Sequence, residues 1–276
     1  IFKAMKGLPV TVRLLDPPLH EFLPSAEELR IKRATKGLSK SETAELKAAE
    51  EWAEHNPMIG TRGVRLGVVK PGLYAMQVRA LMAAAAALRK TGTNPIPEAM
   101  IPLTVTREEL QLARGWVQTE IDRAVKGLKN KPHVTIGTMI ETPRAAIRAD
   151  EIAEEADFFS FGTNDLTQMT FGFSRDDVES KMMPAYLEQG LLKRNPFETI
   201  DVGGVGELVK LGASRGRSVK KGLKLGVCGE HGGDPESIAL FYEAGLDYVS
   251  CSPFRVPIAR LAAAQAVIGG SQTETK

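Results

Sequence analysis

The sequence predicts an α/β fold in which parallel strands alternate with helices, and three observations predict it. Short, mostly apolar runs recur along the chain, each bounded by turn residues. These runs lack a clean alternation of apolar and polar residues, which is typical of strands buried on both faces of a parallel sheet. Longer segments of helical composition separate them. Over 276 residues this alternation means a doubly wound sheet or a (β/α)8 barrel.

Seven runs are predicted as strands, and the second is the weakest. They span residues 10–15, 64–69, 99–103, 134–140, 158–161, 225–228 and 248–251. A complete barrel needs eight strands. We therefore expect one barrel domain over 1–276 that lacks its first strand, because that strand lies before Ile1 in a longer chain. The absence of an initial Met agrees with a cut end at Ile1.

A charged helical insertion is predicted directly after the first strand. Ser25 stands three residues before Glu28, and Ser39 stands three residues before Glu42. Both pairs have the spacing of a capping box, which begins a helix. We expect a solvated helical hairpin over residues 25–55.

The other helices are predicted from composition and from residues that favour helix ends. Alanine and leucine favour a helix over 73–89, and Thr106 begins another with a capping box. Pro143 and Pro235 suit first helical positions. A last helix is expected over 258–268, ending at two glycines, with a mobile tail over 271–276.

Composition excludes several function classes. The net charge of +2, without a Lys or Arg block, gives no indication of nucleic-acid binding. The longest apolar run has eight residues, 81–88, whereas a membrane helix needs about 20. Two cysteines do not make a disulfide framework. We expect a reducing, cytoplasmic compartment, and a plastid or glycosome if a targeting segment was removed.

Two carboxylates are predicted at the carboxyl ends of neighbouring strands, where barrels place their active sites. Glu141 ends one strand, and Asn164 and Asp165 follow the next. Mg²⁺ commonly takes one or two carboxylates and completes its shell with substrate and water. The residues alone leave alternatives open, because Glu141 also suits a cap for the Pro143 helix and either carboxylate could pair with an arginine.

Arg13, Arg62 and Cys228 complete the set of candidates. Arg13 lies in a buried strand and needs an anionic partner, either a ligand or Asp16. Arg62 lies in an irregular loop, where a surface arginine is the ordinary interpretation. Cys228 ends a strand among glycines that leave its sulfur uncrowded, although most such cysteines are inert. His231 is more often structural in such a loop than catalytic.

Six segments resemble the C-terminal barrel of the pyruvate, phosphate dikinase family, within the wider phosphoenolpyruvate (PEP)-utilising group. The resemblance covers nearly the whole chain. The run Leu-Asp-Pro-Pro-Leu-His at 15–20 is specific to the dikinase branch, and the run at 161–168 is shared with the wider group. These two runs lie within the segments 10–24 and 159–168, and the other segments are 56–63, 137–144, 226–235 and 248–260.

The resemblance implies a role for each candidate. Glu141 and Asp165 would hold Mg²⁺, and Arg13 and Arg62 would grip a phosphoryl group. Cys228 would move the proton at the substrate methyl carbon. The remaining substrate-binding residues that it implies are Gly162, Thr163, Asn164 and Asp165.

The resemblance also implies the reaction and the partners. Pyruvate enolate would take a phosphoryl group from a phosphohistidine on another domain, which an ATP-grasp domain charges, giving PEP. Overall, ATP, pyruvate and phosphate would give AMP, PEP and diphosphate. Because neither partner domain is recognisable in this sequence, we expect this chain to bind substrate without completing the ATP-linked reaction. We also expect a homodimer.

Three other interpretations remain open. The chain could be the equivalent barrel of the sugar-transport phosphotransferase enzyme I or of PEP synthase. It could be a Mg²⁺-dependent pyruvate aldolase, which would not need Cys228. It could also serve mainly as a module for dimerisation and binding.

Overall fold

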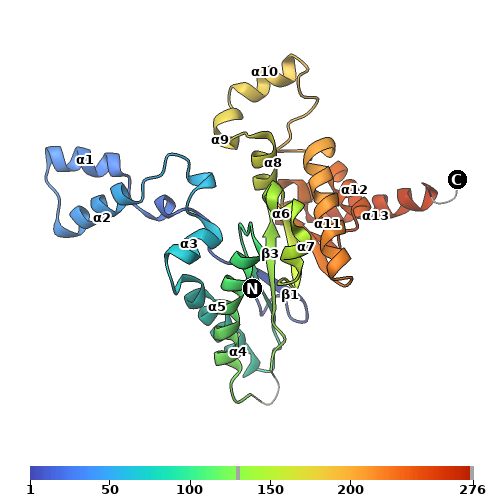
Figure 1. Ribbon diagram of the computed structural model, residues 1–276, viewed down its shortest axis with the longest axis horizontal. Coiled ribbons are helices and arrows are strands. Elements are labelled where there is room, and N and C mark those ends of the chain that lie inside the picture. Colours follow the sequence, from blue (N-terminus) through green and yellow to red (C-terminus); the bar gives the residue numbers. More distant parts are fainter. Residues whose placement is uncertain (129–130, 274–276) are drawn as a thin grey trace.

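A six-stranded parallel sheet forms the centre of the computed structural model, which describes residues 1–128 and 131–273 (Figure 1). The spatial order of the strands equals their order in the chain. Since all neighbouring strands are parallel, all carboxyl ends lie at one edge. The strands are β1 (Pro9–Arg13), β2 (Ile96–Ile101), β3 (Thr135–Ile140), β4 (Phe158–Gly162), β5 (Lys224–Cys228) and β6 (Tyr248–Val249).

Helices connect consecutive strands. They are α1 (Ala26–Thr35), α2 (Lys40–Glu51), α3 (Gly63–Val69), α4 (Leu73–Arg89), α5 (Arg107–Val125), α6 (Pro143–Ile147), α7 (Ala149–Ala153), α8 (Thr163–Phe171), α9 (Arg175–Val178), α10 (Met182–Glu188), α11 (Glu207–Val219), α12 (Pro235–Glu243) and α13 (Val256–Thr273). Short helical turns are η1 (Leu19–Phe22), η2 (Pro57–Ile59), η3 (Val202–Gly206), η4 (Glu230–Gly233) and η5 (Pro253–Arg255).

The sheet is strongly curled. Lys224 on β5 contacts Glu98 on β2 with a nitrogen–oxygen distance of 2.9 Å, although β3 and β4 lie between their strands. Such a contact requires a concave face that closes on itself, as in a barrel. The fold is therefore α/β, and the sheet forms part of a (β/α)8 barrel.

The two faces of the sheet differ in what they bury. Outward-facing residues of the strands pack against α4, α5, α6, α7, α11 and α12 in one large apolar core. The concave face holds a smaller apolar cluster, formed by Met100, Met139 and Phe158 with Cys228 against it. Alternate residues of each strand serve the two faces, as the two-residue period of a strand requires.

One predicted strand is wrong. Residues 64–69 form helix α3, in which Val64 and Leu66 are fully buried. The helix starts at Gly63, whose φ of 56° is a conformation that side-chain-bearing residues rarely adopt. The Gly63 N–H bonds to the Asp16 carbonyl, which fixes the start of α3 beside the end of β1. The other six predicted strands form, with ends within three residues of prediction.

The predicted end of the last helix is also wrong. Helix α13 continues through the two glycines at 269–270 to Thr273. Glycine costs a helix about 1 kcal/mol relative to alanine but does not forbid it. Of the predicted mobile tail, residues 271–273 belong to this helix and 274–276 lie outside the described residues.

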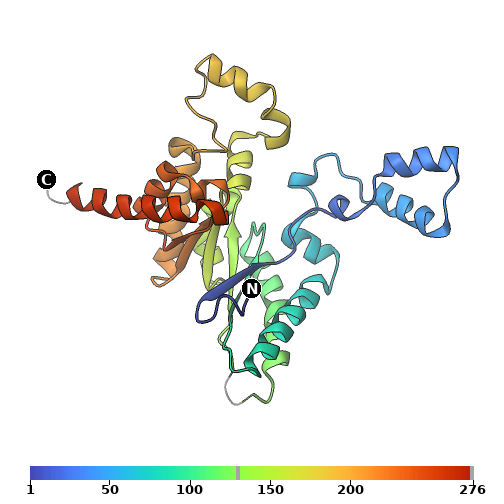
Figure 2. The same ribbon diagram turned by 180° about the vertical axis from the view of Figure 1, so that it is seen from behind.

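Three parts of the chain extend away from the sheet: the α1–α2 hairpin, the α9–α10 segment and α13 (Figures 1 and 2). Both helices of the hairpin begin where the sequence predicts. The Ser25 side chain accepts from the Glu28 N–H at the start of α1, and Ser39 forms a complete capping box with Glu42 at the start of α2. Its packing is slight, with Leu29, Leu46 and Ala49 as its buried residues.

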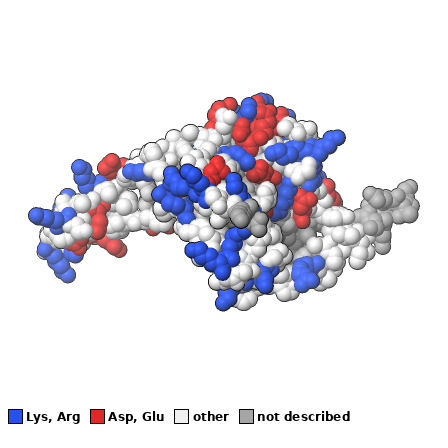
Figure 3. Space-filling model, turned by 90° about the horizontal axis from the view of Figure 1, so that it is seen from below, with Lys and Arg blue, Asp and Glu red and all other residues white. Residues whose placement is uncertain are grey.

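Charges are mixed on the surface. Figure 3 shows basic and acidic side chains interspersed over the face that it views, including the hairpin at one end. This distribution agrees with the small net charge of +2. Among the described residues, no helix combines the length and hydropathy that a membrane crossing requires.

Candidate active site

A cavity of about 330 Å³ opens at the carboxyl ends of the strands, on the concave side. Six of the eight candidate residues line it, and they come from four different strand ends. The lining residues are Arg13, Met100, Met139, Glu141, Gly162, Asn164, Asp165, Cys228 and Gly229. Thr163 and Arg62 lie behind this wall, both buried.

Glu141 is completely buried, and only one of its two carboxylate oxygens is hydrogen-bonded to the described residues. Its Oε1 accepts a 2.6 Å hydrogen bond from the Leu103 N–H, whereas its Oε2 has no partner among the described residues. Leu103 is the one non-glycine residue with a positive φ, 58°, in the described chain. Strain of this kind collects at functional sites, and here it directs an N–H at the carboxylate.

The pKa of Glu141 is raised to about 8, first by burial and then by the charges of Asp165 and Asp16. The alternative that Glu141 caps the following helix is wrong. Thr142 performs that role, because its hydroxyl accepts from the Ala145 N–H. The carboxylate therefore has no helix-capping duty to explain its burial.

Gly162 makes room for the Glu141 carboxylate. A Cβ at this position would lie 2.4 Å from Glu141 Oε2, closer than real atoms approach. Side chains longer than glycine would therefore displace the carboxylate or the end of β4. The close approach also shows that the ends of β3 and β4 bring Glu141 directly against the turn that carries Asp165.

Asp165 and Asp16 hold Arg62 between them. Arg62 Nη1 lies 2.7 Å from Asp165 Oδ1, and Arg62 Nη2 lies 2.6 Å from Asp16 Oδ2. The Arg62 side chain is only 4% exposed. The ordinary interpretation of Arg62 as a surface residue is therefore wrong, because a buried guanidinium needs the two carboxylates that its loop provides.

Of the two partners considered for Arg13, the structure shows Asp16. Arg13 Nη1 lies 3.4 Å from Asp16 Oδ2, so the core carboxylate is present. Its side chain is nevertheless 47% exposed and lines the cavity. Arg13 can therefore reach an anion in the cavity while keeping its carboxylate neighbour.

Cys228 is a protonated thiol at neutral pH. Its pKa is raised to about 11, first by burial and then by the Glu141 charge, against the opposing effects of a hydrogen bond with Ser160 and of Arg13. A thiol of this kind can donate a proton to a group in the cavity. As a nucleophile it would be weak, because the thiolate is the reactive form.

Thr163 and His231 support the cavity from behind. His231 is fully buried, with Nε2 2.8 Å from the Pro196 carbonyl and Nδ1 2.8 Å from the Thr163 hydroxyl. Burial lowers the pKa of His231, so the ring is neutral, donates from Nε2 and accepts at Nδ1. The structural interpretation of His231 is the one that fits, and Thr163 ties this ring to the start of α8.

The donor set suits a small hard cation. Glu141 and Asp165 line one cavity, and the unpartnered oxygens of Glu141 and Asn164 are both buried. In the described residues no three His, Cys, Asp or Glu side chains form a metal cluster. Mg²⁺ does not need such a cluster, since it is usually held by one or two carboxylates plus substrate and water.

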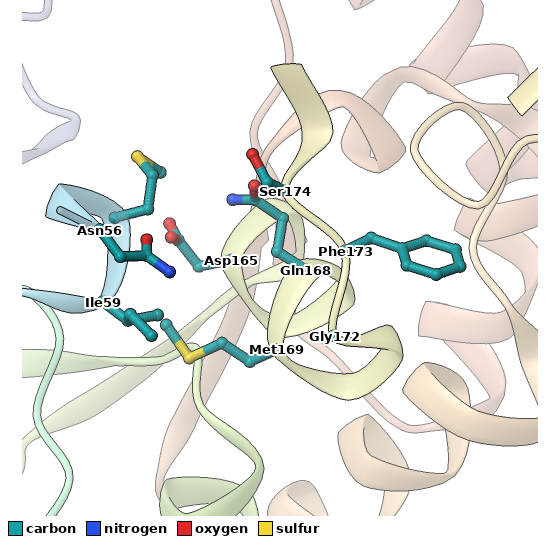
Figure 4. A pocket seen from close by; sticks show the side chains of 9 residues that line it. Asn56, Ile59, Asp165, Gln168, Met169, Gly172, Phe173 and Ser174 are labelled. Atoms are coloured by element: carbon teal, nitrogen blue, oxygen red, sulfur yellow. The ribbon is translucent and has the colours of Figure 1, made fainter. Parts of the chain in front are cut away.

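Asp165 also lines a second cavity, of about 290 Å³ (Figure 4). It is bounded by the η2 loop, with Asn56 and Ile59, and by α8, with Gln168 and Met169. Figure 4 shows the Asp165 carboxylate turned toward Asn56, between these two walls. Asp165 is thus a lining residue of both cavities.

Three residues of the site were missed by sequence reasoning. Met100 and Met139 form an apolar wall, and alternation on β2 and β3 could have placed them on the concave face. Asp16 was considered only as a partner for Arg13, and nothing in its spacing indicates its stronger pairing with Arg62.

Comparisons with known proteins show which proteins this chain resembles. Three plant proteins are each 54% identical over 97% of this chain: pyruvate, phosphate dikinase of Mesembryanthemum crystallinum (chloroplastic), dikinase 1 of Arabidopsis thaliana (chloroplastic) and dikinase 2 of Zea mays. The chain spans only 28–30% of their lengths.

A solved citrate lyase of Burkholderia xenovorans LB400 aligns with 95% of the chain and 78% of its own, at 13% identity and a TM-score of 0.45, which adds nothing to the fold described above. The family described as the PEP-binding domain of PEP-utilising enzymes matches residues 1–268. This chain therefore belongs to the PEP-binding domain family of PEP-utilising enzymes.

Proposed function

We propose that this chain is the PEP- and pyruvate-binding barrel of a pyruvate, phosphate dikinase, and that its cavity binds these ligands with Mg²⁺. One observation carries the proposal: Glu141, with an unpartnered oxygen, lines the same cavity as Asp165 and the protonated Cys228 thiol. The 54% identity to plant dikinases favours this enzyme over enzyme I or PEP synthase.

Glu141 and Asp165 are the proposed ligands of Mg²⁺. A bound Mg²⁺ ion would stabilise the negative charge that develops on the keto acid as its enolate forms. Charge compensation explains why two carboxylates are kept close together in a buried place. Asn164 presents its buried side-chain oxygen to the same cavity, and Gly162 leaves the room that the ligand and Glu141 share.

Arg13 and Arg62 are the proposed phosphoryl-binding groups. A guanidinium binds two phosphoryl oxygens at once, and its positive charge offsets the charge of a phosphoryl group in transfer. Arg13 is half-exposed in the cavity and is available without rearrangement. Arg62 is bonded to Asp165, so its Nη1 becomes available to a ligand only when Asp165 turns away.

Cys228 is the proposed acid and base at the methyl carbon. When PEP gives up its phosphoryl group, the thiol donates its proton to the enolate carbon and pyruvate results. The opposite direction needs the thiolate. Compensation of the Glu141 charge would favour the thiolate, because that charge helps to raise the thiol pKa.

The partners and the compartment are part of the same proposal. The phosphoryl group would come from a phosphohistidine on another domain, charged by an ATP-grasp domain, and the protein would form a homodimer. The plastid names of two relatives favour a plastid alongside the cytoplasm predicted from the two cysteines. The whole-enzyme reaction would convert ATP, pyruvate and phosphate into AMP, PEP and diphosphate.

Calorimetry tests the proposal. PEP is titrated into the purified protein with excess Mg²⁺, and again with chelator. We expect heat of binding only with Mg²⁺, and loss of that heat in Glu141→Gln. Binding that is indifferent to Mg²⁺ would remove the proposed role of the two carboxylates.

A further inference from the structure

Asp16 contacts both arginines that are proposed to bind the phosphoryl group. Its Oδ2 lies 2.6 Å from Arg62 Nη2 and 3.4 Å from Arg13 Nη1, and its Oδ1 lies 3.3 Å from Arg62 Nε. The Asp16 side chain is only 5% exposed. One buried carboxylate therefore joins two guanidinium groups that come from different parts of the chain.

The backbone around Asp16 is held in place from several sides. The Leu15 N–H donates to Gln77, and the Leu15 carbonyl accepts from the Tyr74 hydroxyl, so α4 holds the residue before Asp16. The Asp16 carbonyl accepts from the Gly63 N–H at the start of α3. A carboxylate on so fixed a backbone can fix the side chains that bind to it.

Arg62 divides its donors between two carboxylates of different character. Nε and Nη2 bond to Asp16, and Nη1 makes the shorter of the two bonds to Asp165. Asp165 also lines the cavity and is a proposed cation ligand, whereas Asp16 does not line it. When Asp165 turns to a cation, Asp16 is the carboxylate that keeps Arg62 in place.

We propose that Asp16 is a positioning residue, which holds Arg13 and Arg62 at a fixed separation so that both bind the phosphoryl group of the ligand. This inference rests on the proposed function. If the inference is right, Asp16 raises the affinity for ligands that carry a phosphoryl group. It has little effect on the affinity for ligands held by the cation alone.

A purely electrostatic role predicts the opposite sign. Removing a negative charge next to two arginines raises the local positive potential, so any anion should then bind more tightly. If Asp16 instead positions the guanidinium groups, its removal lets them move, and the phosphorylated ligand loses affinity. The two roles therefore predict changes of opposite sign in the affinity for PEP when Asp16 is replaced.

The test compares two ligands in two variants. PEP and oxalate, a planar dicarboxylate without a phosphoryl group, are each titrated with Mg²⁺ into the wild type, Asp16→Asn and Asp157→Asn. Asp157 is a matched control, because it also holds an arginine, Arg114, at 3.2 Å, but it precedes β4 and lies at the opposite edge of the sheet.

We expect Asp16→Asn to weaken PEP binding about tenfold or more and to change oxalate binding less than about threefold, a difference of at least about 0.7 kcal/mol. Asp157→Asn should change neither. Unchanged or tighter PEP binding in Asp16→Asn, or an equal loss for both ligands, would overturn the inference. If that variant does not fold, Asp16→Glu, which keeps the charge but moves it, should show the same loss for PEP alone.

The two levels of proposal fail differently. If the wild type binds neither ligand with Mg²⁺, the proposed function fails and the inference fails with it. If the wild type binds both ligands and Asp16→Asn does not distinguish them, the positioning role alone is wrong.

Discussion

The two ends of the concave face bury carboxylates in opposite circumstances. Toward the amino ends of the strands, Glu98 accepts from Lys224 at 2.9 and 3.1 Å and from Thr11 at 2.6 Å. At the carboxyl ends, Glu141 accepts one bond, and its other oxygen has no partner in the part of the chain that the structure describes. The difference teaches that a buried carboxylate is fully hydrogen-bonded where it supports the fold and left partly unbonded where a ligand is expected.

The largest effect should come from neutralising the partly unbonded carboxylate. Glu141→Gln should lower the Mg²⁺-dependent affinity for PEP by about 100-fold or more, because an amide is a poor ligand for a hard cation. It should not lower the free energy of unfolding without Mg²⁺, since a neutral side chain is cheaper to bury. Calorimetry and urea denaturation measure the two quantities.

Glu98→Gln is the matched control for that variant. It should lower the free energy of unfolding and leave PEP affinity unchanged, because Glu98 is bonded to the fold and lies outside the cavity lining. If both substitutions changed PEP affinity and the free energy of unfolding in the same way, the proposed difference between Glu141 and Glu98 would be wrong.

The next effect concerns Glu98 and Lys224, toward the amino ends of the strands. Lys224→Met leaves Glu98 buried with only the Thr11 bond and should lower the free energy of unfolding by about 2 kcal/mol. The value is below that of a fully buried pair because Lys224 is 37% exposed. Lys210→Met, which removes an exposed pair with Glu207, should change stability by less than about 0.5 kcal/mol in the same denaturation.

A smaller effect should come from crowding the Glu141 carboxylate at the carboxyl ends of the strands. Gly162→Ala would bring a Cβ to 2.4 Å from Glu141 Oε2, so the carboxylate must shift. We expect Mg²⁺-dependent PEP binding to weaken about tenfold, and stability to fall by about 1 kcal/mol. Gly222→Ala, with no atom within 4 Å of its Cβ, is the control. Equal binding by both variants would show that Glu141 does not need its present position.

The last expected effect is a dependence of stability on pH. The pKa of Glu141 is raised from 4.5 in the unfolded chain to about 8 in the folded protein. The folded state therefore binds the proton more tightly, and the stability that this proton contributes is lost as pH rises through the folded value.

We therefore expect the melting temperature of the metal-free wild type to fall relative to Glu141→Gln between about pH 5 and pH 8, and the difference to level off above about pH 8. Thermal melts in chelator over this range measure it. A difference that stays constant with pH would show that Glu141 keeps its ordinary pKa.

Much of the fold could be predicted because its signals are local. Capping residues at Ser39 and Thr106 and the prolines at 143 and 235 begin helices where the sequence predicts them. Residues 64–69 could not be predicted, because a short apolar run rich in valine suits a strand and a buried helix equally. The deciding contact, from Gly63 to the end of β1, joins distant parts of the chain.

In the candidate site, too, some features could be predicted from the sequence and others could not. Glu141, Asp165 and Cys228 share a cavity because parallel strands bring their carboxyl ends to one edge, which follows from the fold class alone. The burial of Arg62 and its pairing with Asp16, 46 residues away in the chain, depend on how a loop folds over the sheet. No local pattern in the sequence indicates such a pairing.

The protonation of Cys228 has a consequence for how the protein ages. With a thiol pKa of about 11, roughly one molecule in ten thousand carries the thiolate at pH 7. Peroxide and alkylating reagents attack the thiolate, so both should spare this sulfur. The group that we propose to deliver the proton would thereby resist oxidative damage for as long as burial keeps the pKa of its thiol high.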